Sequence, residues 1–440
     1  MNFLFAAVIA VTTLVWGIDV ATTVWPAGVH PLWVARQESV LLTGLLSIAM
    51  MSLAMLLAIR PTWLEAPLGG MDRVYRAHKW AGLLAGLFAI LHWLADQAGG
   101  PIKSLIGKAG RPPKVEYEGL LGHLQHLAKD MGEWAFYAIV ALLLIALWKK
   151  FPYRPWRLLH RVMPVLYLIL AVHAVLLSPP DYWRQPVGWL VAVLLAVGTY
   201  AALCALRGAI GRGRRAAGEI VSIEQPSREL ITVSCRLRHG WSGHRPGQFA
   251  FVTFDTGEGA HPFTIASADR GDGCVTFQIK ALGDYTRQLA TRLRPGQAVQ
   301  VEGPYGCFDL ARADRRAQQI WVAGGVGVTP FLAWLESLQA APEQAPVAEL
   351  HYCTRDRDGD PFVTCLERLC AGLPSICLQV HGERQGQRLD AEGMMSNAPT
   401  ARRSEIWFCG PNGLAAALRA GLRRRWRQHV RFHQEAFEMR

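Results

Sequence analysis

Hydrophobic residues are distributed unevenly along the chain. About the first 210 residues carry long apolar runs, whereas the remainder alternates short apolar and polar segments. Six of the runs approach the roughly 20 residues that a helix needs to cross a bilayer. They lie at about residues 2–25, 38–60, 77–95, 132–148, 156–178 and 187–207. The pattern predicts a membrane bundle of six helices followed by a part outside the membrane.

Basic residues in the connections predict how this bundle is oriented. Cytoplasmic connections carry an excess of lysine and arginine. Such residues lie between the second and third runs, between the fourth and fifth, and after the sixth: Arg60, Arg73 and Arg76; Lys149, Lys150, Arg154 and Arg157; Arg207, Arg212, Arg214 and Arg215. We therefore expect these segments, and the polar half of the chain, to be cytoplasmic.

Two features weigh against this topology without overturning it. The connection at 96–131 holds five basic residues on the predicted outer side, namely Lys103, Lys108, Arg111, Lys114 and Lys129. That connection is long and also acidic, so it counts for less. The first run could instead be a cleaved signal peptide, but it lacks a basic leading region and carries Asp19. Its cleavage would leave the remaining topology unchanged.

Four histidines stand in or beside the apolar runs as two pairs. His78 and His92 are 14 residues apart in the third run, and His160 and His173 are 13 apart in the fifth. An ionisable ring is costly in a lipid-facing helix, so each ring needs a ligand or a partner. At about 1.5 Å of rise per residue, the rings of a pair lie about 20 Å apart along a helix. Two such helices could hold two stacked haems, each iron ligated from both sides.

Helix rotation supports this arrangement for one pair only. At about 100° per residue, His78 and His92 fall about 40° short of four turns and share a face. His160 and His173 fall about 140° short, so they would not align on an ideal helix. Pro164 removes the amide that would bond to the carbonyl of residue 160, and we expect it to distort the helix. The alternative is four buried histidines bonded to the backbone or to each other.

The composition agrees with a membrane protein and argues against two other classes. The chain has 440 residues, 51% of them hydrophobic, and a formal net charge of +12. That charge could indicate nucleic-acid binding, but the Arg/Gly run from Arg207 to Arg215 follows the last apolar run, where anionic headgroups attract it. All nine cysteines lie at or beyond Cys204, which fits reduced cytosolic thiols rather than a disulfide framework.

The polar half divides into two patterns. Up to about Gly306, short strands alternate with turn residues, which is typical of a small antiparallel barrel. These strands are expected at Glu219–Ile223, Leu230–Cys235, Gln248–Phe254, Cys274–Lys280 and Ala298–Glu302. From about Gln318, strands at 320–325, 348–353, 376–382 and 406–410 alternate with helices at 331–339 and after Pro361 and Pro411. That alternation predicts a parallel sheet covered on both faces.

A nucleotide is expected where the parallel strands end. The first of them leads into Gly324, Gly325 and Gly327, and then through Thr329 into a helix. Glycines let backbone amides approach a pyrophosphate, and a helix N-terminus favours its negative charge. A glycine cluster alone could be only a tight turn, but its place between strand and helix favours a dinucleotide site.

A basic residue at the end of the next strand could determine which of the two nicotinamide cofactors binds. Arg355, with Arg357 near it, could pair with a 2′-phosphate, which favours NADPH over NADH. Three interleaved acids, Asp356, Asp358 and Asp360, could equally make this segment a solvated loop.

Several motifs occur in order along the polar half of the chain: Pro246-Gly247-Gln248-Phe249, the run from His261 to Ser267, the run from Ile279 to Thr286, Gly303-Pro304-Tyr305-Gly306, the run from Gly324 to Phe331, Phe408-Cys409-Gly410-Pro411, and a tail bearing Phe437. Together they resemble the ferric reductase and NADPH oxidase superfamily. The four histidines and the motifs of both later regions occur in the order typical of that superfamily. The resemblance therefore covers nearly the whole chain. It implies six transmembrane helices at 1–212 and a ferredoxin-reductase-like module. That module comprises an antiparallel β-barrel FAD domain at 213–312 and an α/β NAD(P)H-binding domain at 313–440.

The resemblance also implies roles for individual residues. His78 pairs with His160 at an inner haem, and His92 with His173 at an outer one. FAD is lined by His261, Pro262, Phe263 and Thr264, with Lys280, Gly283 and Thr286 toward its phosphates. NAD(P)H lies at Gly324, Gly325, Gly327, Thr329, Arg355, Gly410 and Pro411. Phe437 stacks on the flavin and Cys409 lies near the hydride path, although each could instead be an ordinary buried residue.

The implied activity is transmembrane electron transfer from NAD(P)H through FAD and two b-type haems to an acceptor outside. The outer connections lack cysteine and a dense carboxylate cluster, which favours oxygen, giving superoxide, over ferric iron. His123 and His126 in the outer connection are interpreted as solvated. A third acceptor is a periplasmic partner enzyme, and the compact chain favours a bacterial inner membrane. The rival class is a diaphorase that the helices merely anchor, without haem.

Overall fold

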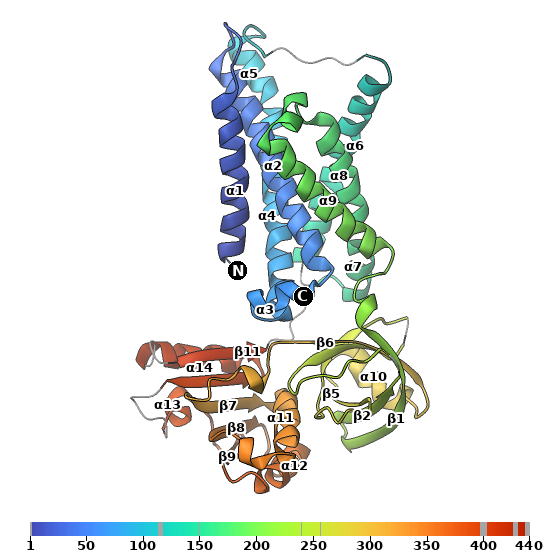
Figure 1. The fold of residues 1–440 in the computed structure, drawn as a ribbon, viewed down its shortest axis with the longest axis vertical. Helices are drawn as coiled ribbons and strands as arrows, with labels where there is room; N and C mark the ends of the chain where they lie inside the picture. The colour runs from blue at the N-terminus through green and yellow to red at the C-terminus, as the bar shows by residue number, and fades with distance from the viewer. Residues whose placement is uncertain are drawn as a thin grey trace. The chain divides into compact units, whose positions relative to one another are not determined.

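The computed structural model describes residues 2–112, 118–148, 150–238, 240–255, 257–396, 403–425 and 430–435. The chain forms two compact units. The helical unit comprises Met1–Leu64 and Arg73–Ile210, and the sheet unit comprises Glu65–Asp72 and Gly211–Arg440. Figure 1 shows the helices and strands of both.

The helical unit contains six helices long and apolar enough to cross a membrane, among the described residues: Phe3–Thr22, Pro31–Ala58, Met71–Ile106, Gly119–Leu147, Pro155–Leu177 and Pro186–Leu206. The helices themselves are α1 (Asn2–Thr22), α2 (Pro31–Ala58), α4 (Met71–Gln97), α5 (Gly99–Ile106), α6 (Gly119–Leu147), α7 (Tyr153–His160), α8 (Met163–Leu177) and α9 (Pro186–Leu206). The six-helix bundle predicted from the apolar runs is confirmed. A short helix, α3 (Thr62–Leu68), follows α2.

The predicted start of the fourth span at about residue 132 is wrong, because α6 begins at Gly119. The connection at 96–131 contains α5 and the first turns of α6, so exposed His123 and His126 lie on a helix. The polar residues Lys129 and Asp130 ended the apolar run without ending the helix, because lysine is a good helix former and aspartate is tolerated on an exposed face.

Helices in this unit approach each other at small residues. A Cβ added to Gly198 on α9 would lie 2.0 Å from the Tyr167 hydroxyl on α8. That hydroxyl is 2.9 Å from the Ser52 hydroxyl on α2. Close backbone approach and interhelical hydrogen bonds replace the hydrophobic driving force that is missing in lipid.

The sheet unit begins with six antiparallel strands in the order β4-β3-β6-β1-β2-β5. Their bounds are β1 (Arg215–Ser227), β2 (Leu230–Leu237), β3 (Phe249–Thr253), β4 (His261–Thr264), β5 (Cys274–Lys280) and β6 (Ala298–Tyr305). Ile265, just after β4, pairs with Phe277 of β5, so the two outer strands meet and the sheet closes as the predicted barrel does. The sequence prediction lacked β4, a short strand in which Pro262 argues against a ladder.

The rest of the unit is a five-stranded parallel sheet in the order β11-β10-β7-β8-β9. Its strands are β7 (Gln318–Gly324), β8 (Ala348–Thr354), β9 (Ile376–Gly382), β10 (Ser404–Cys409) and β11 (Val430–Glu435). Helices α11 (Thr329–Gln339) and α12 (Pro361–Ala371) cover one face, and α13 (Ala391–Met394) and α14 (Asn412–Arg425) the other (Figure 1). The predicted α/β domain is confirmed, with β11 as an additional strand.

Candidate functional site

The two histidine pairs meet inside the helical unit. His78 and His92 both lie on α4, whereas His160 ends α7 and His173 lies on α8. The ring centroids of His78 and His160 are 6.0 Å apart, and those of His92 and His173 are 6.4 Å apart. The fold therefore brings together the same pairs that the resemblance implies.

These separations fit a metal ion between two imidazoles. A metal–nitrogen bond is about 2 Å long and a ring centroid lies about 1 Å behind its nitrogen, so two ligating rings stand about 6 Å apart. Three rings also turn one nitrogen away from the pair: the Nδ1 atoms of His78, His92 and His173 lie 2.8–2.9 Å from backbone carbonyls. A donated Nδ1–H leaves Nε2 as the ligand atom. The described residues thus fit two bis-imidazole haems.

A break in the fifth span explains how His160 and His173 reach one side. Helix α7 ends at His160 and α8 begins at Met163, with Pro164 in its first turn. The amides of Arg161 and Val162 close a turn onto Leu158 and Leu159 instead of continuing the α-helical bonds. The departure from one ideal helix that Pro164 predicts is present.

Two glycines beside the outer pair went unnoticed in the sequence. A Cβ added to Gly132 on α6 would lie 2.2 Å from Nδ1 of His173. A Cβ added to Gly44 on α2 would lie 3.1 Å from Nδ1 of His92. Both glycines leave room for an imidazole that bonds to a carbonyl of the same helix. The only sequence signal is a small residue inside an apolar run.

The predicted flavin motif forms strand β4 of the barrel. In the register with β3, Thr264 lies opposite Phe249 and Pro262 opposite Phe251. The ring of His261 stacks on Tyr285 of α10 (Asp284–Arg292), at 4.1 Å between centroids and 16° between planes. The motif therefore meets the N-terminal turn of α10 through its first residue.

That turn holds the residues predicted to approach the flavin phosphates. The Thr286 hydroxyl accepts hydrogen bonds of 3.0 Å from the amides of Leu282 and Gly283 and donates to the Gly283 carbonyl. Lys280, at the end of β5, lies 3.5 Å from Glu229. A helix N-terminus with a nearby cation suits an anion, but the lysine is already partly neutralised.

The predicted dinucleotide loop is built from two distant segments. Gly324 ends β7 and is followed by a tight turn, Gly325–Val328, before α11 begins at Thr329. A Cβ added to Gly327 would lie 2.3 Å from the Cys409 carbonyl, and one added to Gly324 would lie 2.6 Å from Cδ of Pro411. The glycine loop and the segment from Cys409 through Gly410 to Pro411 are thus packed together at the carboxyl edge of the sheet.

Arg355 lies just past β8 and is exposed. Two of its acidic neighbours are engaged elsewhere. Asp360 accepts hydrogen bonds from the Tyr352 and Thr354 hydroxyls and caps α12, and Asp356 pairs with Arg384 at 2.6 Å. The exposed Arg355 side chain thus lies at the strand end, where a nucleotide ribose is read in such folds.

Cys409 ends β10, is 2% exposed and lies beside Glu435 of β11. Burial, followed by the Glu435 charge, raises the pKa of the Cys409 thiol well above its ordinary value. Burial likewise raises the pKa of Glu435, which is 8% exposed. Cys409 is therefore a neutral thiol rather than a nucleophilic thiolate. Phe437, predicted to stack on the flavin, lies outside the described residues.

Helix α3 lies more than 140 residues before the barrel in the sequence, yet it contacts the residue that follows β6. Glu65 of α3 is 8% exposed, and its carboxylate accepts a 2.6 Å hydrogen bond from the amide of Gly306, just after β6. A Cβ on Gly306 would lie 3.0 Å from Glu435. Sequence reasoning missed Glu65 because a single acidic residue in a connection carries no pattern.

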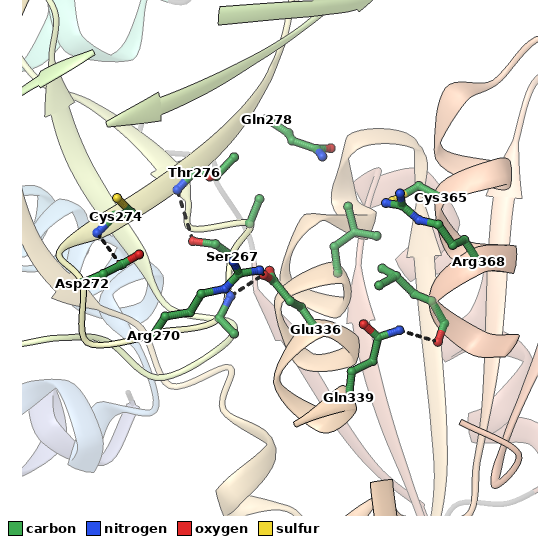
Figure 2. A pocket seen from close by; sticks show the side chains of 14 residues that line it. Ser267, Arg270, Asp272, Cys274, Thr276, Gln278, Glu336, Gln339, Cys365 and Arg368 are labelled. Carbon is green, nitrogen blue, oxygen red and sulfur yellow. Dashed lines mark hydrogen bonds and ion pairs between the residues drawn. The ribbon is translucent and has the colours of Figure 1, made fainter. Parts of the chain in front are cut away.

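A cavity of about 540 Å³ lies between the barrel and helices α11 and α12, and Figure 2 shows the residues that line it. Arg270 pairs with Glu336 at its edge, and Glu336 also accepts the Ala268 amide at 3.0 Å. None of the predicted cofactor residues lines this cavity. It is therefore separate from the dinucleotide loop.

Two protein families match consecutive parts of the chain. Residues 43–171 match the ferric reductase like transmembrane component, and residues 216–309 match an FAD-binding domain. The first match includes His78, His92 and His160 and ends two residues before His173. The second includes the β4 motif, Lys280, Gly283 and Thr286.

Individual relatives match less than the whole chain. Vanillate O-demethylase oxidoreductase of Pseudomonas putida is 29% identical over 153 residues, which is 34% of this chain and 45% of the relative. Respiratory burst oxidase homolog protein E of Arabidopsis thaliana is 27% identical over 207 residues, 41% of this chain and 21% of the relative. The chain spans about half or less of the length of these two curated relatives.

Among solved structures, the cytochrome P450 reductase GcoB of Amycolatopsis is similar with a TM-score of 0.44 and 19% identity, over 51% of this chain and 70% of that one.

The family matches indicate what kind of protein this is. A match to the ferric reductase like transmembrane component is followed in one chain by a match to an FAD-binding domain, and a respiratory burst oxidase homolog is among the relatives. These matches, in this order along one chain, are consistent with the ferric reductase and NADPH oxidase superfamily.

Proposed function

We propose that the protein carries electrons across a membrane from NAD(P)H, through FAD and two b-type haems, to an acceptor on the other side. The observation that carries this proposal is the pair of imidazole separations, 6.0 and 6.4 Å, each suited to one iron. When bound, FAD would accept a hydride and release its electrons singly to haem irons, which take one electron each. The chain's own contribution is spacing, axial ligation and exclusion of water.

The sheet unit would bind the two soluble-side cofactors. His261, Pro262, Phe263 and Thr264 would line the flavin ring, with Lys280, Gly283 and Thr286 at its phosphates. The glycine loop at Gly324, Gly325 and Gly327, with Thr329, Gly410 and Pro411, would cradle the dinucleotide. Arg355 would bind a 2′-phosphate, so NADPH is the preferred donor. Cys409 would lie near the hydride path as a neutral thiol that packs without attacking the cofactor.

We place the domain boundaries at 1–212, 213–312 and 313–440. The basic connections favour a cytoplasmic sheet unit, and we locate the protein in a bacterial inner membrane. The acceptor on the far side is proposed to be oxygen, giving superoxide. Ferric iron and a periplasmic partner enzyme are the alternatives.

The acceptor can be tested on the purified full-length protein with NADPH. We expect aerobic reduction of a superoxide-sensitive dye that superoxide dismutase abolishes, together with little anaerobic release of ferrous iron from a ferric chelate. His92→Ala is the matched variant, because it removes one proposed outer ligand and leaves the sheet unit unchanged. Iron reduction without superoxide would contradict oxygen as the acceptor, and dye reduction that His92→Ala leaves unchanged would contradict passage through the outer haem.

A further inference from the structure

Three of the four proposed haem ligands are oriented in the same way. Nδ1 of His78 lies 2.8 Å from the Ala54 carbonyl, that of His92 lies 2.9 Å from the Val40 carbonyl, and that of His173 lies 2.9 Å from the Ala128 carbonyl. The carbonyls belong to α2 and α6, so a neighbouring helix holds each ring. Such bonds fix ring orientation and increase the electron donation of the ligating nitrogen.

His160 lacks this anchor. Within the part of the chain that the structure describes, no hydrogen bond to its ring is present. Instead, its ring stacks against Trp156, at 5.2 Å between centroids and 21° between planes. Trp156 precedes it by four residues on α7, so both side chains lie on one helix face.

The position of His160 makes an orienting contact necessary. It is the last residue of α7, and the chain turns at Arg161 and Val162 before α8 begins. A residue at a helix end has fewer backbone constraints than one inside a helix such as His78 or His173. Packing against a large flat indole restricts the ring where no carbonyl does.

We propose that Trp156 is the positioning residue for His160, performing by stacking what a backbone carbonyl performs for each of the other three imidazoles. This inference rests on the proposed haem ligation. It makes the inner site, His78 with His160, the one site whose ligand geometry depends on a replaceable side chain. The outer site, His92 with His173, is held by backbone on both sides and is independent of Trp156.

A tryptophan near a helix end could instead serve only as an anchor at the membrane interface, where such rings gather. An anchor would affect insertion and overall stability, and it would leave the spectra of the two haems unchanged. The two roles are therefore separated by a readout specific to one haem.

The test uses the full-length protein in detergent, with electron paramagnetic resonance of the oxidised haems and transfer of haem to excess apomyoglobin. His160→Ala first identifies which low-spin signal belongs to the inner haem. In Trp156→Leu we expect that same signal to change and one haem to be lost roughly 10- to 100-fold faster, the size typical for removing a partner of a metal ligand. Trp189→Leu, an exposed tryptophan on α9, is the matched control and should behave as wild type.

Trp156→Phe keeps an aromatic face of smaller area and should show a smaller change in the same signal. If Trp156→Leu does not fold, Trp156→Phe decides alone. An unchanged inner signal and unchanged haem loss in the folded variant would overturn the proposal, as would equal changes at both haems. Wild-type protein without haem would contradict the proposed function itself, which is a different outcome from failure of the Trp156 inference.

Discussion

At the scale of single residues, the orientation of the proposed haem ligands depends on the atoms that surround each histidine ring. The four histidines were evident from the sequence, because ionisable rings at matched spacing stand out in apolar runs. The residues that orient them were not evident. Backbone carbonyls have no sequence signature, and Gly44 and Gly132 look like any small residue in a membrane helix.

Gly132 offers a sharp prediction. In Gly132→Ala, the added methyl group would occupy space 2.2 Å from Nδ1 of His173, so we expect the ring to lose its bond to the Ala128 carbonyl. A displaced ligand should alter or abolish the outer haem in the reduced-minus-oxidised spectrum. Gly82→Ala on α4 is the control, since nothing lies within 4 Å of its added Cβ. Two unperturbed haems in Gly132→Ala would show that the close approach is unimportant.

Arg355 gives a second prediction at this scale. Arg355→Ala should weaken NADPH and leave NADH almost unchanged, because only NADPH carries the 2′-phosphate. A charge-assisted hydrogen bond contributes about 1.5–3 kcal/mol, so we expect roughly a 10- to 100-fold rise in KM for NADPH. Arg388→Ala, whose guanidinium lies 2.8 Å from Glu383, is the matched control. Equal losses with both cofactors would refute the assigned role.

At the scale of elements, the segment Glu65–Asp72 is the least expected feature. It is continuous with the helices on either side of it, yet it belongs to the sheet unit. The bond from the Gly306 amide to Glu65 holds it there, with the charges of Arg214 and Arg312 nearby. Burial still raises the pKa of Glu65, with the Asp72 charge adding to the effect.

Substitutions at Glu65 should separate hydrogen bonding from charge. Glu65→Ala leaves the Gly306 amide without its acceptor and should destabilise the sheet unit by about 1–3 kcal/mol. Glu65→Gln keeps an acceptor oxygen and should cost much less. Since the folded-state pKa is raised, wild type should lose stability as pH rises above 4.5 through the folded pKa, whereas Glu65→Gln should lack that contribution. Thermal unfolding at several pH values measures both effects, and equal midpoints for the three proteins would contradict them.

Strands and helices were predictable where periodicity or length was strong. Five barrel strands, the parallel strands β7 to β10 and the six apolar helices were anticipated from pattern alone. β4 was not, because it is four residues long and contains Pro262, and its identity came only through the family motif. β11 was not, because its six residues alternate without a flanking turn signal. The extension of α6 back to Gly119 was hidden by polar residues that a helix accepts.

At the scale of the whole molecule, the two units divide the proposed reaction. The sheet unit would take up an electron pair from the dinucleotide, and the helical unit would pass single electrons between two sites about 20 Å apart along α4. The proposed cofactors were inferred from particular residues. The acceptor was not indicated by a comparable residue pattern, and among the described residues no group of three or more His, Cys, Asp or Glu side chains is placed to hold a metal ion.

The most direct test is to purify the full-length protein from cells supplied with ample haem, and to measure haem and flavin per chain with the reduced-minus-oxidised spectrum. We predict two b-type haems with bis-imidazole spectra and one flavin per chain, and reduction of both haems by NADPH. His78→Ala should remove the inner haem and block reduction of the outer one by NADPH. Flavin without haem in the wild-type protein would contradict the account and leave a membrane-anchored dehydrogenase.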